Sequence, residues 1–202
     1  MAVIVVMNET RKSIIGIGID QGIADCGFSV VKLTEHGELI VLKSGIIKTS
    51  SESPLPQRMT LLYSLLMDLV ETYKPDIIGC EKLFFNPRQK ASSDGKKGRN
   101  KSASIVMTNM ATGIINLIAG RKQVQLQEFV PGTVKKYVAG SGRADKDAVI
   151  AAVRHLLQRE NLKEHEADAT AIGITAVKFY RDMQGQMPAK KSKKRKMKGV
   201  KE

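Results

Sequence analysis

The sequence of 202 residues predicts an α/β protein with a mixed five-stranded sheet and helices on both faces. Two observations carry this expectation. Three strand-like apolar runs open the chain with short turns between them, which is typical of an antiparallel meander. The strand-like runs that follow alternate with helical patterns. The predicted order is therefore β-β-β-α-β-α-β-α-α-α, without an internal repeat or a second domain.

The first strand is the stretch around which the rest of the chain is organised. Residues 13–20 are rich in β-branched isoleucine and end in the carboxylate of Asp20. Gly22 then permits a tight turn, and strands at residues 26–33 and 39–47 complete the meander. A carboxylate at the end of an apolar strand is costly unless it is paired, hydrogen-bonded or bound to a cation. Asp20 is therefore a candidate functional residue, and a simple turn-capping role is the alternative.

The remaining elements follow from hydrophobic periodicity and from helix-ending prolines and glycines. Helices are predicted at residues 58–73, 104–119, 131–138, 145–158 and 164–183. Strands are predicted at residues 76–81 and 123–129. The first of these two strands ends in a second carboxylate, Glu81, by the same pattern as the first strand of the chain.

The formal net charge of +13 is concentrated in two segments. Residues 86–103 carry six basic side chains against Asp94, a net charge of +5, and residues 185–202 carry eight against Glu202, a net charge of +7. The rest of the chain is nearly neutral. Segments of this kind suit a polyanion, with nucleic acid first and an anionic membrane surface second. A solubilising or targeting tail is the plainer alternative.

Domain limits and compartment are also predicted from the composition. Two cysteines, Cys26 and Cys80, lie in strand-like contexts and are expected to be reduced core thiols, which favours a cytoplasmic location. No run is long enough to cross a bilayer, and we expect no membrane association. The expected divisions are a leader at 1–12, a globular domain at 13–183 with a basic insertion loop at 86–103, and a disordered basic tail at 184–202.

Three acidic residues are predicted to meet at one place. If the strands that end in Asp20 and Glu81 are neighbours, their carboxylates project from adjacent strand ends. Asp168 lies in the last helix, and His165 shares its helix face as a potential ligand or general acid/base. Clustered carboxylates suit Mg²⁺, and a pair of such ions can promote phosphodiester hydrolysis. A lysine-paired Glu81 and a solvated Asp168 are the ordinary alternatives, but the joint pattern on a basic protein favours a metal nuclease.

Five short motifs follow one another in a definite order. They are GIDQG at 18–22, PLPQR at 54–58, YKPDIIGCEKLFF at 73–85, VKKYVAGSGRADK at 134–146 and HEADATAIGI at 165–174. In this order and spacing they resemble the RuvC-type Holliday junction resolvases, and the resemblance runs from about Ile14 to Tyr180. It implies an RNase H-like fold. It also implies a homodimer that binds four-way DNA junctions and nicks them symmetrically with two Mg²⁺ or Mn²⁺ ions.

The resemblance also implies roles for individual residues. By position, the metal ligands and catalytic residues are Asp20, Glu81, His165 and Asp168. Phe84 matches an aromatic wedge against junction bases, with core packing as the alternative for it and for Phe85. Lys135 and Lys146 match lysines that contact the scissile backbone, with solvated helix-end charges as the alternative. Further DNA contacts are expected from the basic insertion, namely Arg88, Lys90, Lys96, Lys97, Arg99 and Lys101.

The chain departs from the family pattern at four points. Gln21 replaces the usual proline, which is expected to change only turn stiffness. About a dozen residues are inserted after Phe85, more than most connections contain. Residues 108–113 differ from the usual LGQARG-like segment, which puts the inherited dimer packing and cleavage preference in question. The basic tail indicates a divergent or phage-encoded member, and the sequence identifies no motor partner.

Three other functions fit parts of the pattern. A broader branched-DNA nuclease would act on flaps and forks as well as junctions. An actin-like ATPase also opens with a GIDxG strand, but the chain is short for two such lobes and lacks a second phosphate hairpin. A protein that binds junctions without cutting them would not need all four acidic and histidine positions.

Overall fold

The protein is described by a computed structural model that covers residues 12–83, 97–159 and 161–186, with the backbone alone at 97–104 and 186. The described strands are β1 (Ile14–Asp20), β2 (Asp25–Leu33), β3 (Leu39–Lys48), β4 (Ile77–Glu81) and β5 (Gln125–Phe129). The described helices are α1 (Leu55–Tyr73), α2 (Lys97–Lys122), α3 (Pro131–Ala139), α4 (Lys146–Leu157) and α5 (Glu164–Gln186). Their order along the chain confirms the predicted order.

The strands form one mixed sheet in the order β3-β2-β1-β4-β5. Strands β1, β2 and β3 pair antiparallel as the predicted meander, whereas β4 pairs parallel to β1 and to β5. Because β1 and β4 are parallel neighbours, their carboxyl ends meet at the same edge of the sheet. This edge carries Asp20 and Glu81, as the sequence predicts.

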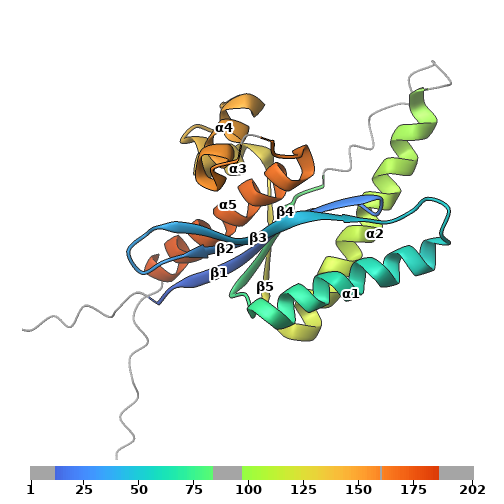
Figure 1. The fold of residues 1–202 in the computed structure, drawn as a ribbon, viewed down its shortest axis with the longest axis horizontal. Coiled ribbons are helices and arrows are strands. Elements are labelled where there is room, and N and C mark those ends of the chain that lie inside the picture. Colours follow the sequence, from blue (N-terminus) through green and yellow to red (C-terminus); the bar gives the residue numbers. More distant parts are fainter. Residues whose placement is uncertain (1–11, 84–96, 160, 187–202) are drawn as a thin grey trace, which may run out of the picture.

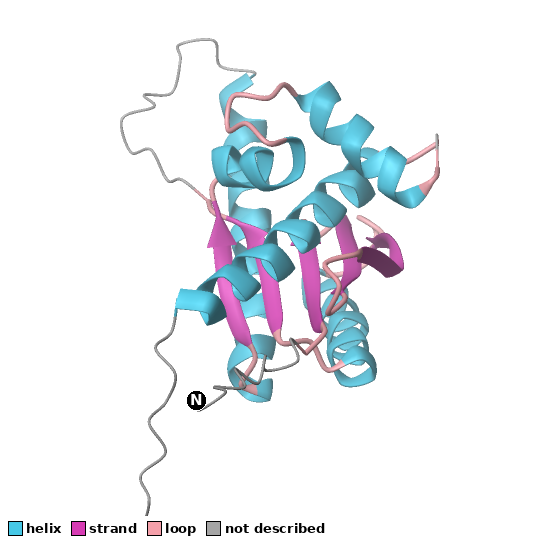
Figure 2. Ribbon diagram, turned by 90° about the vertical axis from the view of Figure 1, so that its left-hand side faces the viewer, coloured by secondary structure: helices cyan, strands magenta, loops and turns pink. Residues whose placement is uncertain are grey.

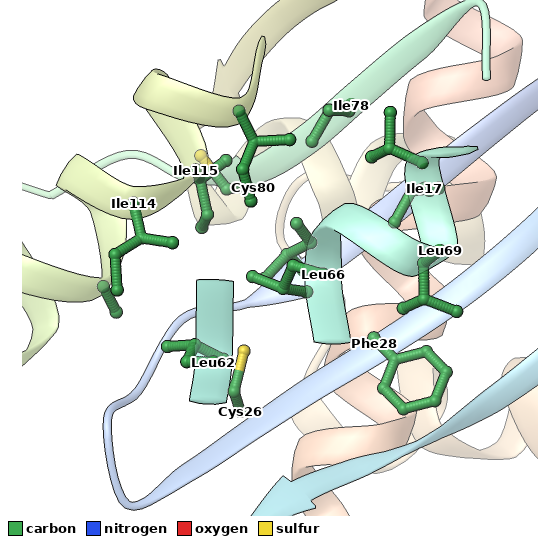
Figure 3. Packing of buried hydrophobic residues seen from close by; sticks show 14 of the residues in the cluster. Ile17, Cys26, Phe28, Leu62, Leu66, Leu69, Ile78, Cys80, Ile114 and Ile115 are labelled. Atoms are coloured by element: carbon green, nitrogen blue, oxygen red, sulfur yellow. The ribbon is translucent and has the colours of Figure 1, made fainter. Parts of the chain in front are cut away.

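Helices α1 and α2 cover one face of the sheet, and α5 crosses the other face together with α3 and α4 (Figures 1 and 2). Beneath α1 and α2, buried side chains form a continuous core (Figure 3). It contains Leu62 and Leu66 of α1 and Ile115 of α2. Cys26 and Cys80 are free thiols in this core, and burial raises the pKa of each to about 12. The expectation of reduced core thiols is confirmed.

Glycines let α5 lie directly on the sheet. A Cβ atom at Gly18 of β1 would lie 2.1 Å from the carbonyl oxygen of Ala169, and one at Gly27 of β2 would lie 2.0 Å from that of His165. No side chain larger than hydrogen fits at either position. The amino-terminal turns of α5 are therefore held against β1 and β2, next to the sheet edge that carries Asp20.

Several helix limits differ from those predicted. Helix α1 begins at Leu55 rather than at residue 58, because prolines are tolerated in the first turn. Helix α2 begins at Lys97, whereas a loop was expected up to residue 103. The end of the basic segment is helical because lysine and arginine are good helix formers. Helix α5 continues to Gln186. Among the described helices, none is both long and apolar enough to span a bilayer.

Candidate active site

Four predicted site residues meet at the carboxyl edge of the sheet. Asp20 ends β1, Glu81 ends β4, and His165 and Asp168 lie in the first turns of α5. The structure brings Asp20 into contact with His165 and couples Glu81 and Asp168 to Asp20 through charge. This arrangement depends on the parallel pairing of β1 with β4 and on the close approach of α5 to the sheet.

Asp20 and His165 form the closest contact in the cluster. The Nδ1 atom of His165 lies 2.6 Å from Oδ2 of Asp20, although the two residues are 145 positions apart in the chain. The hydrogen bond to this carboxylate raises the pKa of His165 above its ordinary value of 6.5. The imidazolium form therefore persists to higher pH than in a solvated histidine, and it holds the carboxylate of Asp20.

The carboxylates repel one another. Burial raises the pKa of Glu81, and the nearby charges of Asp20 and Asp168 raise it further. Burial also raises the pKa of Asp168, and the charge of Lys146 opposes this shift. The Nζ atom of Lys146 lies 3.7 Å from Oδ2 of Asp168 and contacts the carboxylate of Glu164. The cluster therefore concentrates negative charge, which His165 and Lys146 partly offset.

The donor set suits a hard cation. Within residues 12–83, 97–159 and 161–186, no three His, Cys, Asp or Glu side chains converge closely enough to form a ready metal cluster. In this arrangement Asp20 contacts His165 and Asp168 faces Lys146. Carboxylate oxygens that repel one another are the ligands that Mg²⁺ and Mn²⁺ prefer. The residues fit a divalent cation, which would compete with these two cationic side chains for the carboxylates.

Gln21 has a role that sequence reasoning missed. Its Nε2 atom donates a hydrogen bond of 2.6 Å to the main-chain oxygen of Glu81, and its Oε1 atom accepts one of 3.1 Å from the main-chain nitrogen of Glu81. The side chain is 7% exposed. The expectation that Gln21 changes only turn stiffness is wrong. The sequence signal for this role was the position of the glutamine directly after a strand-ending aspartate. At such a position, water would not hydrogen-bond the side-chain amide.

A partly buried ion pair, with Glu166 buried and Arg159 half exposed, supports the first turn of α5 and was also missed. The carboxylate of Glu166 accepts a hydrogen bond from Ser44 of β3 at 2.7 Å and pairs with Arg159 at 2.8 Å. Glu166 thus ties α5 to the edge strand of the sheet. Glu166 and Arg159 are seven residues apart and lie on either side of the turn between α4 and α5. No helical periodicity therefore reveals the pair in the sequence.

The structure describes only some of the predicted DNA-binding residues. Lys146 joins the carboxylate cluster, whereas Lys135 on α3 makes no hydrogen bond or ion pair with the described part of the chain. The structure gives only the backbone for Lys97, Arg99 and Lys101 in the first turns of α2. The remaining predicted contacts lie outside the described residues, namely Phe84, Phe85, Arg88, Lys90 and Lys96.

The strand order and the helices on both faces define an RNase H-like α/β protein. Residues 15–176 match the family model described as crossover junction endodeoxyribonuclease RuvC. The chain therefore belongs to the RuvC family of crossover junction endodeoxyribonucleases. The RuvC protein of Alkaliphilus metalliredigens (strain QYMF) is 34% identical over 78% of this chain and 89% of its own length.

Solved structures agree with this assignment. Thermus thermophilus RuvC superimposes with a TM-score of 0.68 at 26% identity, covering 84% of this chain and 96% of its own. T. thermophilus RuvC in complex with Holliday junction substrate gives a TM-score of 0.70 at 25% identity, covering 85% and 96%. The yeast mitochondrial Holliday junction resolvase Ydc2 shares the fold, with a TM-score of 0.56 at 17% identity, covering 88% and 84%.

Proposed function

We propose that this protein is a Holliday junction resolvase. It binds a four-way DNA junction as a homodimer and hydrolyses one phosphodiester bond in each of two strands. The observation that carries the proposal is the meeting of Asp20, Glu81, His165 and Asp168 at one sheet edge in a member of the RuvC family. The junction complex of the T. thermophilus relative supports the substrate class.

We assign the metal site to Asp20, Glu81, Asp168 and His165. These residues would hold two Mg²⁺ or Mn²⁺ ions, which supply Lewis-acid stabilisation of the phosphorane-like transition state and an activated water. His165 bonds Asp20 through Nδ1, so its Nε2 atom remains to accept or donate a proton. Lys146, once displaced from Asp168, presents an ammonium group to the phosphate.

The same proposal extends to DNA binding outside the cluster. Lys135 and Lys146 contact the phosphate backbone next to the cleaved bond. Phe84, with Phe85 beside it, acts as the wedge at the junction, and the basic insertion and tail follow the DNA arms. Motifs and charge support these assignments. A chromosomal or phage DNA substrate and the two reduced thiols favour a cytoplasmic location.

The outer face of α1 and α2 is our proposed dimer interface. Leu61 and Leu65 of α1 are 45% and 39% exposed, and Leu117 of α2 is 54% exposed. Leu61 and Leu65 lie one turn apart on the same side of α1. Large apolar side chains grouped on neighbouring helices are typical of a surface that a partner covers. A second copy of the chain would bury this face and set two cleavage sites on one junction.

The cleavage of a labelled mobile four-way junction, with a linear duplex and a flap beside it, tests the proposal. Wild-type protein with Mg²⁺ should give paired, symmetric nicks in the junction alone, and chelation should abolish them. Asp20→Asn should lower the cleavage rate at least 10³-fold, an order-of-magnitude expectation for loss of a metal ligand. It should bind the junction as tightly as wild type, because less negative charge faces the phosphates.

Glu35→Gln, at an exposed glutamate in the turn between β2 and β3, is the matched control and should cleave normally. Full activity of Asp20→Asn would overturn the assigned site. Cleavage of flaps by the wild type would establish the broader branched-DNA nuclease. Junction binding without cleavage under any divalent metal would establish a binding protein instead. The family assignment leaves the actin-like ATPase without support.

A further inference from the structure

The two strands that carry Asp20 and Glu81 lose their main-chain pairing just before these residues. Strands β1 and β4 pair in register from Gly16 opposite Ile77 to Ile19 opposite Cys80. The next position would set Asp20 against Glu81, but the ladder between the strands has ended there. On its other side, Glu81 remains paired with β5, where Lys82 donates a hydrogen bond of 2.9 Å to Phe129.

Gln21 replaces the missing rung of the ladder. In a parallel pair, the N–H and C=O groups of one residue point to the same neighbouring strand. Both groups of Glu81 that point to β1 are engaged by the side-chain amide of Gln21, at 3.1 and 2.6 Å. A primary amide offers both an N–H donor and a C=O acceptor, as a peptide group does. The Gln21 side chain therefore extends the pairing past the last backbone pair of the ladder, Ile19 with Cys80.

The hydrogen bonds of Gln21 connect the backbone next to Asp20 directly to the backbone of Glu81. Gln21 follows Asp20 directly in the chain and holds the main chain of Glu81, 60 residues away. The charges of Asp20 and Asp168 act against the ionised form of Glu81, so the strand ends experience a repulsion that favours their separation. Because Gln21 is buried, water competes poorly for its amide.

We infer that Gln21 is a positioning residue that sets the separation of the Asp20 and Glu81 carboxylates for metal binding. This inference rests on the proposed function, because it takes both carboxylates as ligands. Mg²⁺ demands near-ideal octahedral geometry and tolerates displaced ligands poorly. Loosening the Gln21 contact should therefore weaken Mg²⁺ binding at least as strongly as Mn²⁺ binding. Residues that orient metal ligands commonly contribute 10-fold to 100-fold, in rough terms, to metal affinity.

The test measures Mn²⁺ binding to the full-length, DNA-free protein by electron paramagnetic resonance of free Mn²⁺, and Mg²⁺ binding by displacement of Mn²⁺. Gln21→Met keeps the volume of the side chain and removes both hydrogen bonds. Its Kd for Mn²⁺ should rise about tenfold. Gln21→Asn keeps an amide that is too short to reach both groups of Glu81, and its Kd should rise by a similar factor. The matched control is Gln127→Met, which removes a glutamine amide bond of 3.0 Å to the carbonyl of Glu128.

Junction cleavage separates positioning from a general structural role. In Gln21→Met, the Mg²⁺ concentration for half-maximal rate should rise about tenfold. The rate at saturating Mn²⁺ should stay within about threefold of wild type, because the ligands and the phosphate contacts remain. A mutation that merely loosened the fold would lower the rate at every metal concentration and would lower the thermal midpoint equally with and without Mn²⁺.

Each outcome decides between the two proposals. If Asp20→Asn binds Mn²⁺ as tightly as wild type, the metal site itself is wrong and the role of Gln21 falls with it. If Asp20→Asn loses Mn²⁺ while Gln21→Met and Gln21→Asn bind it within about twofold of wild type, only the role of Gln21 is wrong. If neither variant shows a cooperative thermal transition, Gln21 is required for folding, and the inference is likewise overturned.

Discussion

At the scale of single residues, His165 and Lys146 supply positive charge to two of the carboxylates that would hold a divalent ion. His165 lies 2.6 Å from Asp20, and Lys146 lies 3.7 Å from Asp168. A cation that binds the carboxylates would compete with both positive charges. Metal binding should therefore release the proton that Asp20 helps His165 to retain.

The pH dependence of Mn²⁺ affinity follows from this competition. Below the raised pKa of His165, the imidazolium holds Asp20 and repels the metal ion; above it, the neutral ring releases Asp20 and offers a ligand. Affinity should therefore increase with pH above 6.5, by up to about tenfold per pH unit until the raised pKa is passed. Titrations at several pH values measure this. His165→Asn, which carries no titrating proton, should flatten this part of the profile; an equally steep profile would contradict the competition.

At the scale of elements, the site depends on the direct packing of α5 on β1 and β2. Gly18 and Gly27 leave room for the helix backbone, and Glu166 joins the first turn of α5 to Ser44 of β3. This packing brings His165 and Asp168 to the sheet edge. A change that lifts α5 should therefore damage stability and the metal site together.

Gly18→Ala tests this packing. The new methyl group would lie 2.1 Å from the carbonyl oxygen of Ala169 and 2.2 Å from the nitrogen of Gly173, and a helix backbone yields little. Overpacking of this kind should lower the free energy of unfolding by about 3 kcal/mol, measured by urea denaturation. Gly185→Ala in α5 is the control, because its new methyl group meets no atom within 4 Å. This change should raise the free energy of unfolding by up to about 1 kcal/mol. A neutral effect of Gly18→Ala would contradict the close approach.

At the scale of the whole molecule, symmetric cleavage requires two copies of the site. The exposed leucines of α1 and α2 supply an apolar surface on the face of the sheet opposite α5. Leu117→Glu should convert the dimer to a monomer in sedimentation equilibrium and leave monomer stability within about 0.5 kcal/mol of wild type. Leu42→Glu makes the same change at a 40% exposed position on the edge strand β3 and should remain dimeric. A dimeric Leu117→Glu protein would place the interface elsewhere.

If the basic tail binds DNA as proposed, it should contribute to junction affinity through released counterions. Removing residues 187–202 leaves α5 intact and eliminates a net charge of +7. The plot of log binding constant against log salt concentration should become shallower, by up to about 6 in slope if nearly every charge meets a phosphate. Fluorescence anisotropy with a labelled junction over a salt series gives the slope. An unchanged slope would mean that the tail does not contact DNA.

Much of the candidate site was predictable from local patterns. Asp20 and Glu81 end apolar strands, which hydrophobic periodicity reveals, and the three-residue spacing of His165 and Asp168 puts them on one helix face. Neither the Gln21 amide nor the Glu166 ion pair follows such a period. The early start of α2 was missed because basic residues at a helix end look like a charged loop.

Local periodicity and motifs are sufficient to predict the order of elements, the charge distribution, the candidate ligands and the resemblance to the RuvC family. The partner of each candidate ligand follows instead from the three-dimensional packing. The contact of Asp20 with His165 joins residues 145 positions apart, and that of Gln21 with Glu81 joins residues 60 positions apart. Such pairs depend on how α5 crosses the sheet and on where the ladder between β1 and β4 ends. No local pattern in the chain encodes either of these.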